Sequence, residues 1–308
     1  MYNEDIKKRY CKIKLETAML SENFLTNIFR RSEPFEKDLG KDICNFTTQE
    51  IENMYRTMNF VSIYTLTTAN SGYSGYTAWC LGQGMVNDSQ NHFAEFDRAR
   101  LYTLLNKAVN DMRIIPRDKV LEYCHQMPNA MDSFVMLGLF EGIRGKEFCE
   151  FLHMHGSDID VDKNEINVCG RGVLPYSHEL CVFGKEASEA EYYYSVTGSG
   201  DYSVKFETSD LVCKNYPNVN PNVSDNQKGR RIYNKLLRGF SYLGIKDWMN
   251  ANALVDSGIV YMIKTESDRY GMAWRDYLSE HIGDVRKRFN RKFEKATLVQ
   301  KYADYLDE

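Results

Sequence analysis

The chain has 308 residues, of which 43% are hydrophobic and 27% charged, with a formal net charge of −4. This length allows two domains with separate cores, and the composition is that of a globular protein and excludes a disordered or collagen-like one. No apolar run approaches the ~18–20 residues of a membrane-spanning helix, and the charged start MYNEDIKKRY lacks a signal-peptide core, so we expect a cytoplasmic protein.

The first third of the chain reads as helical. Thr47 and Glu50 form a capping-box pair ahead of residues 51–58, where apolar side chains recur at helical spacing. Residues 73–84 repeat aromatic side chains at the same spacing and end in two glycines, which is typical of a helix end. Such a stripe is more often core than a base-stacking surface, and we assign it to the core. Residues 96–112 predict one further helix.

A domain boundary is predicted at RIIPRDKV, where a proline interrupts the helical pattern. We therefore expect one domain over residues 1–114 and a second over residues 115–308. The second domain should begin with helices, because residues 132–141 (DSFVMLGLFE) are apolar nearly all round and predict a buried helix that leads into Gly142.

The pattern then changes to one that is typical of strands. Alternating apolar residues between Ile159 and Val168 predict two strands joined by a turn at residues 162–164, and residues 170–172 predict a second turn. Strand-like sequence continues to about Val212. The prolines and asparagines that follow predict a loop, and from Gly229 onward the chain is again helical in pattern.

The eight cysteines include no CxxC pair and fall mostly inside apolar patterns, which indicates reduced, buried thiols. His153 and His155 form an H-x-H that could ligate a metal from one strand face. Without a third ligand nearby, two histidines at the edge of a packed segment is the favoured interpretation. We expect no metal and no cofactor.

Positive charge is concentrated in two runs, although the net charge alone argues mildly against a nucleic-acid partner. A solvated helix face would explain one such run, whereas two of them indicate a phosphate-binding surface. The runs are KGRRIYNKLLRG, with Lys228, Arg230, Arg231, Lys235 and Arg238, and DVRKRFNRKFEK, with Arg286, Lys287, Arg288, Arg291, Lys292 and Lys295.

EGIRGKEF followed by SDIDVDKNEINVCGRG resembles the first arginine box of the tyrosine recombinases and phage integrases and the hairpin sheet after it. FTTQEIENMYRTMN and SGYSGYTAWCLGQG resemble the helical core-binding domain of the same family, so the resemblance covers most of the chain. It implies a mixed, mainly α fold: a helical core-binding domain that clamps one side of a duplex, then an α+β recombinase-type domain with a small antiparallel sheet.

The resemblance also implies which residues the chemistry needs. In this family a tyrosine attacks a DNA phosphodiester, two arginines stabilise the charged phosphorus centre, a hairpin lysine protonates the leaving oxygen and a histidine assists proton transfer. The first arginine corresponds to Arg144, with Glu147 as its structural companion. The hairpin lysine corresponds to Arg171, a poor proton donor because a guanidinium does not titrate in proteins.

The second box of the family, H-x-L-R-H-S, falls on the segment ANALVDSGIVYMI. Its histidine, arginine and second histidine are replaced by Asn252, Val255 and Asp256, while Leu254 and Ser257 keep the pattern. An acid beside an anionic reaction centre opposes phosphoryl transfer.

The third box and the nucleophile are matched weakly. Arg291 or Lys292 lies nearest to the position of the third-box histidine or tryptophan. Tyr302 stands roughly where the nucleophile would be, but the chain has 21 tyrosines and Tyr305 follows closely. Cations therefore remain at residues 144 and 171, whereas the proton carriers and the second phosphate clamp are absent.

The favoured hypothesis is a non-catalytic, sequence-specific DNA-binding protein that resembles the recombinase-fold repressors of SPβ-type prophages and controls lysogeny. Its partner would be duplex operator DNA in the bacterial cytoplasm, with the protein associated with the nucleoid as a monomer or homodimer and open to a regulatory protein. Arg144 would contact a phosphate or pair with Glu147. The candidate DNA contacts are Arg144, Arg171, Lys228, Arg230, Arg231, Lys235, Arg286, Lys287, Arg288, Arg291 and Lys292.

Two alternatives remain open. The chain could be an active integrase whose missing arginine is supplied by Arg269 or Arg275, although neither has a histidine three residues before it. It could also be an accessory protein that acts through contacts with a recombinase.

Overall fold

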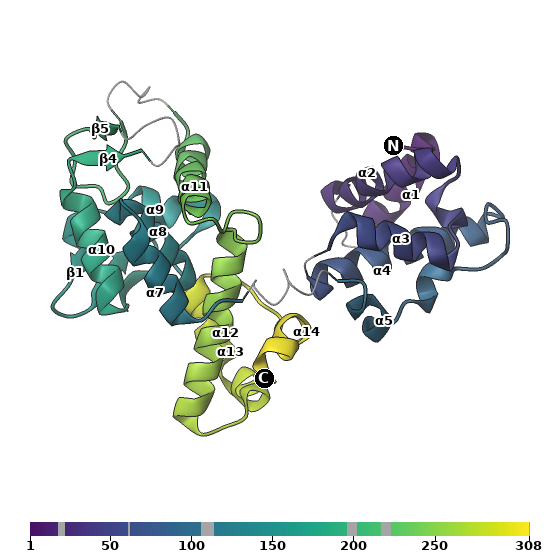
Figure 1. Ribbon diagram of the computed structural model, residues 1–308. Coiled ribbons are helices and arrows are strands. Elements are labelled where there is room, and N and C mark those ends of the chain that lie inside the picture. Colours follow the sequence, from purple (N-terminus) through teal and green to yellow (C-terminus); the bar gives the residue numbers. More distant parts are fainter. Residues whose placement is uncertain (18–21, 61, 106–113, 196–201, 217–222, 308) are drawn as a thin grey trace. The chain divides into compact units, whose positions relative to one another are not determined.

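The computed structural model describes residues 1–17, 22–60, 62–105, 114–195, 202–216 and 223–307. The chain divides into two units, Met1–Asp111 and Met112–Glu308 (Figure 1), each with its own cluster of buried apolar side chains. The fold is mainly helical with small antiparallel sheets, as the sequence predicted. Within the described residues, no helix is long and apolar enough to cross a membrane.

The first unit is helical throughout its described part. The predicted capping box is confirmed: the Thr47 hydroxyl accepts from the backbone N–H of Glu50, whose carboxylate accepts from the N–H of Thr47 at 2.7 Å. The described helices of the first unit are α1 (Glu4–Thr17), α2 (Glu22–Leu39), η1 (Ile43–Asn45), α3 (Thr48–Met58), α4 (Ile63–Gly82), η2 (His92–Glu95) and α5 (Arg98–Tyr102).

The aromatic stripe on α4 is core, as predicted, since Tyr73 and Tyr76 are fully buried. The single helix expected over residues 96–112 is wrong in its extent. Helix α5 ends at Tyr102, and the Thr103 hydroxyl donates to the Arg100 carbonyl at 2.8 Å, a local bond that competes with helix continuation. Residues 106–112 of that prediction lie outside the described residues.

The second unit is built around α8, whose residues are buried along its whole length, so the predicted buried helix is confirmed. Helices from four other parts of the sequence, α7, α10, α11 and α12, pack against it (Figure 1). The helices are α7 (Arg117–Gln126), α8 (Ala130–Phe140), η3 (Lys146–Phe148), α9 (Cys149–Leu152), η4 (Gly156–Asp158), α10 (His178–Glu189), α11 (Asp225–Tyr242), α12 (Ala251–Tyr270), α13 (Trp274–Phe289) and α14 (Lys295–Leu306).

Three short strands, β1 (Ile159–Asp160), β2 (Glu165–Val168) and β3 (Gly172–Pro175), form the predicted antiparallel sheet in the order β1-β2-β3. A two-stranded sheet of β4 (Tyr192–Tyr194) and β5 (Ser203–Lys205) follows.

The expectation of further strand-like sequence to about Val212 is confirmed at β4 and β5 and is wrong between them and β3. Helix α10 occupies His178–Glu189, and the hydroxyl of Ser177 caps it by accepting from the N–H of Leu180. One face of α10 is buried, including Leu180, Cys181 and Gly184, and it packs on α8. The 3.6-residue repeat of this buried face is helical, and the short run CVF imitates a strand.

Helices α8 and α12 approach each other very closely at Gly258. A Cβ atom there would lie 1.7 Å from the carbonyl oxygen of Phe140, so a side chain would force the helices apart. We expect Gly258→Ala to lower the free energy of unfolding by roughly 1–3 kcal/mol or more. Gly283→Ala is the matched control, because no atom lies within 4 Å of its Cβ position and alanine favours a helix by about 1 kcal/mol. Urea unfolding of both variants checks this, and equal effects would contradict the packing.

Candidate functional site

Arg144 lies in a tight turn that glycines make possible after α8. Gly142 has a φ of +91°, and a Cβ atom there would lie 2.4 Å from the carbonyl oxygen of Arg288. Gly145 has a φ of +62°, and its Cβ would lie 2.4 Å from the Sγ of Cys149. Both positions require glycine. The turn therefore holds Arg144 close to the end of α13.

The Arg144 side chain faces the start of α12. Its Nη1 donates to the Oδ1 of Asn252 at 2.7 Å, and its guanidinium lies 5.6 Å from the centre of the Phe148 ring. Burial lowers the pKa of Arg144, as does the nearby cation of Arg291, whereas the Asp256 carboxylate opposes that shift. A guanidinium stays charged in proteins. Arg144 therefore presents a half-buried positive charge at a hollow that Tyr233 also lines.

The carboxylate that supports this turn is Glu150, and the expectation that Glu147 is the companion of Arg144 is corrected. Glu147 is exposed and lies at a φ of +55°. The Glu150 side chain is 2% exposed, and its Oε2 accepts from the backbone N–H of Arg144 at 2.8 Å. The alternative in which the Arg144 guanidinium pairs with Glu147 is also corrected, because the guanidinium donates to Asn252 instead. A lone acid between Cys149 and the apolar pair Phe151-Leu152 was the sequence signal for a buried carboxylate.

Arg171, at the turn between β2 and β3, points into the protein. Its Nη1 donates to Glu150 Oε2 at 3.1 Å and to the Gly142 carbonyl at 3.0 Å. Its Nη2 donates to the carbonyls of Lys287 and Arg288, at 2.8 and 2.7 Å, at the C-terminal end of α13. The side chain is 8% exposed. We therefore correct the expectation that Arg171 contacts DNA, because its donors are already engaged inside the fold.

Tyr302 is buried and its hydroxyl is bonded to an acid. The tyrosine is 1% exposed, and its hydroxyl donates to the Oδ1 of Asp256 at 2.8 Å. The same oxygen accepts from the Nζ of Lys301 at 2.6 Å. Asp256 is itself 2% exposed. A carboxylate thus stands next to the hydroxyl that the family resemblance places near the nucleophile's position.

The position that corresponds to the second arginine carries no charge, because it is occupied by Val255, which is buried on α12 at 2% exposure. The two proposed substitutes lie elsewhere. Arg269 is 74% exposed and 17 residues after Asn252 along α12, about 25 Å at 1.5 Å per residue. Arg275 is engaged by Asp307, with both contacts at 2.8 Å. The arginine whose charge acts on Arg144 is instead Arg291, of the basic run at the end of α13.

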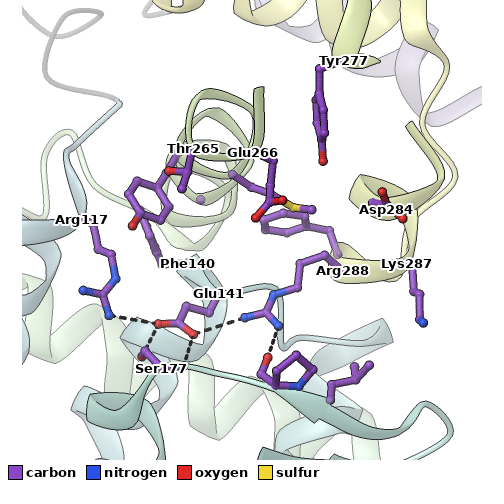
Figure 2. A pocket seen from close by; sticks show the side chains of 16 residues that line it. Arg117, Phe140, Glu141, Ser177, Thr265, Glu266, Tyr277, Asp284, Lys287 and Arg288 are labelled. Carbon is purple, nitrogen blue, oxygen red and sulfur yellow. Dashed lines mark hydrogen bonds and ion pairs between the residues drawn. The ribbon is translucent and has the colours of Figure 1, made fainter. Parts of the chain in front are cut away.

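The basic run at the end of α13 is only partly a surface feature. Arg288 donates to the carboxylate of Glu141 at 3.3 Å and to the Pro175 carbonyl (Figure 2). Its guanidinium also lies 4.1 Å from the centre of the Tyr176 ring. Arg286 donates through Nε to the Phe293 carbonyl at 2.7 Å. These internal bonds correct the expectation that Arg288 and Arg286 serve mainly DNA.

Lys287 and Lys292 of the same run are exposed, and Arg291 is half-buried. These three positively charged side chains remain accessible to a phosphate, and their role as DNA contacts stays a prediction.

The basic run on α11 divides in the same way. Arg230 is exposed, and Lys228 and Arg231 are partly exposed. Lys235 is 8% exposed, and its amine lies 4.5 Å from the centre of the Tyr216 ring and 4.9 Å from that of Tyr193. Lys235 is therefore not the surface phosphate contact that the sequence suggested, because aromatic rings surround its amine.

The H-x-H histidines each pair with an acid from another segment. His153 Nε2 lies 3.2 Å from a carboxylate oxygen of Asp225, and His155 Nδ1 lies 2.7 Å from one of Asp210. In the described part of the chain, no cluster of three or more histidine, cysteine or acidic side chains could hold a metal ion.

Comparisons with known proteins assign both parts of the chain. Residues 1–83 match the family model described as MrpR, N-terminal core-binding domain, and residues 114–307 match the one described as MrpR, C-terminal catalytic domain. The SPbeta prophage-derived uncharacterized protein YopR of Bacillus subtilis (strain 168) is 22% identical over 319 residues, covering 100% of this chain and 94% of that protein.

Two solved structures are more distant. A lambda integrase dimer bound to a COC' core site is 14% identical and covers 96% of this chain and 94% of its own, with a TM-score of 0.45. The Tn1549 transposon integrase in complex with a circular intermediate DNA is 12% identical, with a TM-score of 0.44. The match covers 96% of this chain and 93% of the integrase chain. At these scores the likenesses carry no functional weight.

We expect Arg171→Gln to lower the free energy of unfolding by about 3–5 kcal/mol, because it leaves Glu150 buried without its cationic partner. Arg171→Lys should recover part of the loss, since an ammonium cannot reach four acceptors as a planar guanidinium does. Lys287→Gln is the control and should change stability by less than about 0.5 kcal/mol. Urea unfolding measures all three, and an unchanged Arg171→Gln protein would rule out the structural role.

Proposed function

This chain belongs to the MrpR family, which has the core-binding and catalytic-type domains of integrases, and we propose that it grips duplex DNA at specific sites without cutting it. The biological role would be that of a phage or prophage transcriptional repressor that controls lysogeny. The family membership supports the DNA-binding fold, and the individual side chains of the site support the absence of cleavage.

The observation that carries the proposal is the contact between Asp256 and Tyr302. A nucleophilic tyrosine must approach a phosphorus atom whose oxygens are negatively charged. Here the hydroxyl of Tyr302 donates to a carboxylate oxygen at 2.8 Å, in a setting where both residues are buried. To attack a phosphate, the hydroxyl would have to leave this buried carboxylate, which the Nζ of Lys301 also holds through the same oxygen at 2.6 Å.

The missing donors add to this barrier. Val255 replaces the second arginine, and Asn252 replaces a group able to carry a proton and uses its Oδ1 to accept from Arg144. Each preorganised donor that stabilises a charged transition state is typically worth about 3–4 kcal/mol. Loss of the clamp and of the proton carriers together would lower a cleavage rate by several powers of ten.

Binding to DNA requires cations that can contact phosphates but no proton carriers, and the second unit still has such cations. Arg144 keeps its charge at an open hollow. The exposed cations Arg230 and Lys287 lie on α11 and α13 of the same unit, and exposed Lys292 lies between α13 and α14. Contacts of this kind to the phosphate backbone supply affinity without distorting any bond. Sequence readout would come from the helical first unit and from α11.

The prophage assignment is supported by the relative in Bacillus subtilis, which is described as SPbeta prophage-derived. A repressor of this kind would act in the cytoplasm of a bacterial host, associated with the nucleoid. It would bind operators as a monomer or homodimer, and a regulatory protein could relieve that binding.

An active recombinase with a non-standard site is the second candidate, and the family description "catalytic domain" favours it. It would need a second cation at the phosphate. Arg275 is hydrogen-bonded to the carboxylate of Asp307, and Arg269 lies at the opposite end of α12 from Asn252. Arg291 could supply the second cation, because its charge lowers the pKa of Arg144. It would still have to act in the presence of Asp256, whose carboxylate also acts on Arg144.

The proposal predicts one or a few preferred sites on the genome of the host phage. Gel-shift titrations of genome fragments against random competitor DNA should show at least a thousandfold preference, as specific binders typically reach about 10³–10⁷. Affinity should fall as salt rises. Absence of any preferred fragment would refute the repressor role and leave generic DNA binding standing.

Arg144 gives a sharper prediction for the mode of binding. We expect Arg144→Gln to weaken duplex affinity about equally for all sequences and to reduce the salt slope by about 1, the effect of one lost phosphate contact. Arg269→Gln is the control, since that arginine is 74% exposed at the far end of α12. Fluorescence anisotropy over a range of salt concentrations measures both. An unchanged slope for Arg144→Gln would mean that this arginine serves the fold alone.

A further inference from the structure

A small pocket on the second unit, which shares no lining residue with the hollow at Arg144, is lined by cations. Its volume is about 120 Å³, and its lining includes Lys214, Lys228, Arg231, Lys235 and Arg238 but no aspartate or glutamate. Four of these residues lie on α11 at spacings of three and four, which places them along one face of the helix. Exposed Arg230, in the same basic run, does not line the pocket.

Three of these cations, Arg231, Lys235 and Arg238, are poorly compensated by the protein, whereas Lys228 pairs with Asp225 at 3.4 Å and the Nζ of Lys214 donates to the Ala190 carbonyl at 2.7 Å. The Nη1 of Arg231 is buried and, among the described residues, has no hydrogen-bond partner. The Nζ of Lys235 contacts a carbonyl oxygen, that of Lys214, at 3.4 Å and the sulfur of Met131 at 3.8 Å. Within the described chain, no carboxylate lies within ion-pair distance of Arg231, Lys235 or Arg238.

Asp132, the buried acid whose charge acts on Lys235, is already engaged. Asp132 is 2% exposed, and its Oδ2 accepts from the hydroxyl of Tyr193 at 2.9 Å and from the amide of Asn129 at 3.1 Å. Burial lowers the pKa of Lys235 to about 8; Asp132 opposes that shift, and the cations Arg238 and Arg231 add to it. Gathering like charges in a partly dry pocket is costly unless an anion joins them.

We propose that this pocket binds one phosphate group. A planar guanidinium and nearby ammonium groups match the oxygens of a phosphate, and a buried, unpaired arginine N–H is a donor ready for one of them. The pocket is much smaller than the ~300–1,000 Å³ of sites for drug-sized ligands, so it would hold the phosphate while the rest of the ligand remained outside. The inference does not depend on the proposed function, because the pocket is separate from Arg144.

The test is calorimetric titration of the full chain with inorganic phosphate, with chloride at matched ionic strength as the reference. We expect saturable binding that Arg231→Gln weakens at least tenfold and that the matched control Arg230→Gln changes less than twofold. Arg238→Gln, at an exposed pocket position, is a second variant with the same expected direction. Without phosphate, Arg231→Gln should have a thermal midpoint at or above that of the wild type, because an unpaired cation is removed.

Two sources can supply the phosphate, and duplex DNA separates them. If the DNA backbone supplies it, inorganic phosphate competes with duplex at constant ionic strength and Arg231→Gln weakens duplex affinity at least tenfold. If a small phosphorylated molecule supplies it, Arg231→Gln abolishes phosphate binding and leaves duplex affinity within twofold. Either result supports the site. It is overturned if the wild type shows no saturable phosphate binding, or if Arg230→Gln and Arg231→Gln lose it equally.

Discussion

The buried carboxylate of Glu150 holds the second unit together at the point where its functional site is built. It accepts from the backbone of Arg144, from the guanidinium of Arg171 and from the amide of Asn290. These partners belong to the turn after α8, to the hairpin and to the residue that ends α13. Arg171 also donates to the last carbonyls of α13, where a cation is favoured by the helix dipole. One ion pair therefore fixes three segments that are far apart in the sequence.

If the protein holds DNA without cutting it, as proposed, this arrangement explains how an integrase-type architecture can persist without cleavage chemistry. The position of Arg144 depends on glycine turns and on Glu150, and none of these groups takes part in proton transfer. Cleavage would further require charge and proton carriers at the reacting phosphate. Val255 and Asp256 at those positions are compatible with the fold, because both are buried on α12 and Asp256 has Lys301 and Tyr302 as partners. A scaffold for holding DNA is compatible with such losses.

Features encoded by neighbouring residues could be predicted from the sequence, whereas long-range partners could not. The capping box at Thr47, the aromatic face of α4 and the buried helix α8 each depend on local spacing, and the structure confirms them. The sequence analysis named Glu147, and the role of Glu150 depends on a turn with positive φ values that a short motif does not reveal. The inward direction of Arg171 and Arg288 depends on carbonyls more than 110 residues away in the chain. Charge in a sequence shows where cations are, and the fold decides which of them face a partner.

The central claim is that the site holds DNA and does not cut it, and covalent trapping tests it most directly. A duplex carrying the preferred binding sequence, with a phosphorothiolate at each candidate phosphodiester in turn, would be saturated with the protein and then denatured. We predict full occupancy before denaturation and no protein–DNA adduct after it. An adduct that forms with the wild type and disappears in Tyr302→Phe would contradict the account and identify an active recombinase.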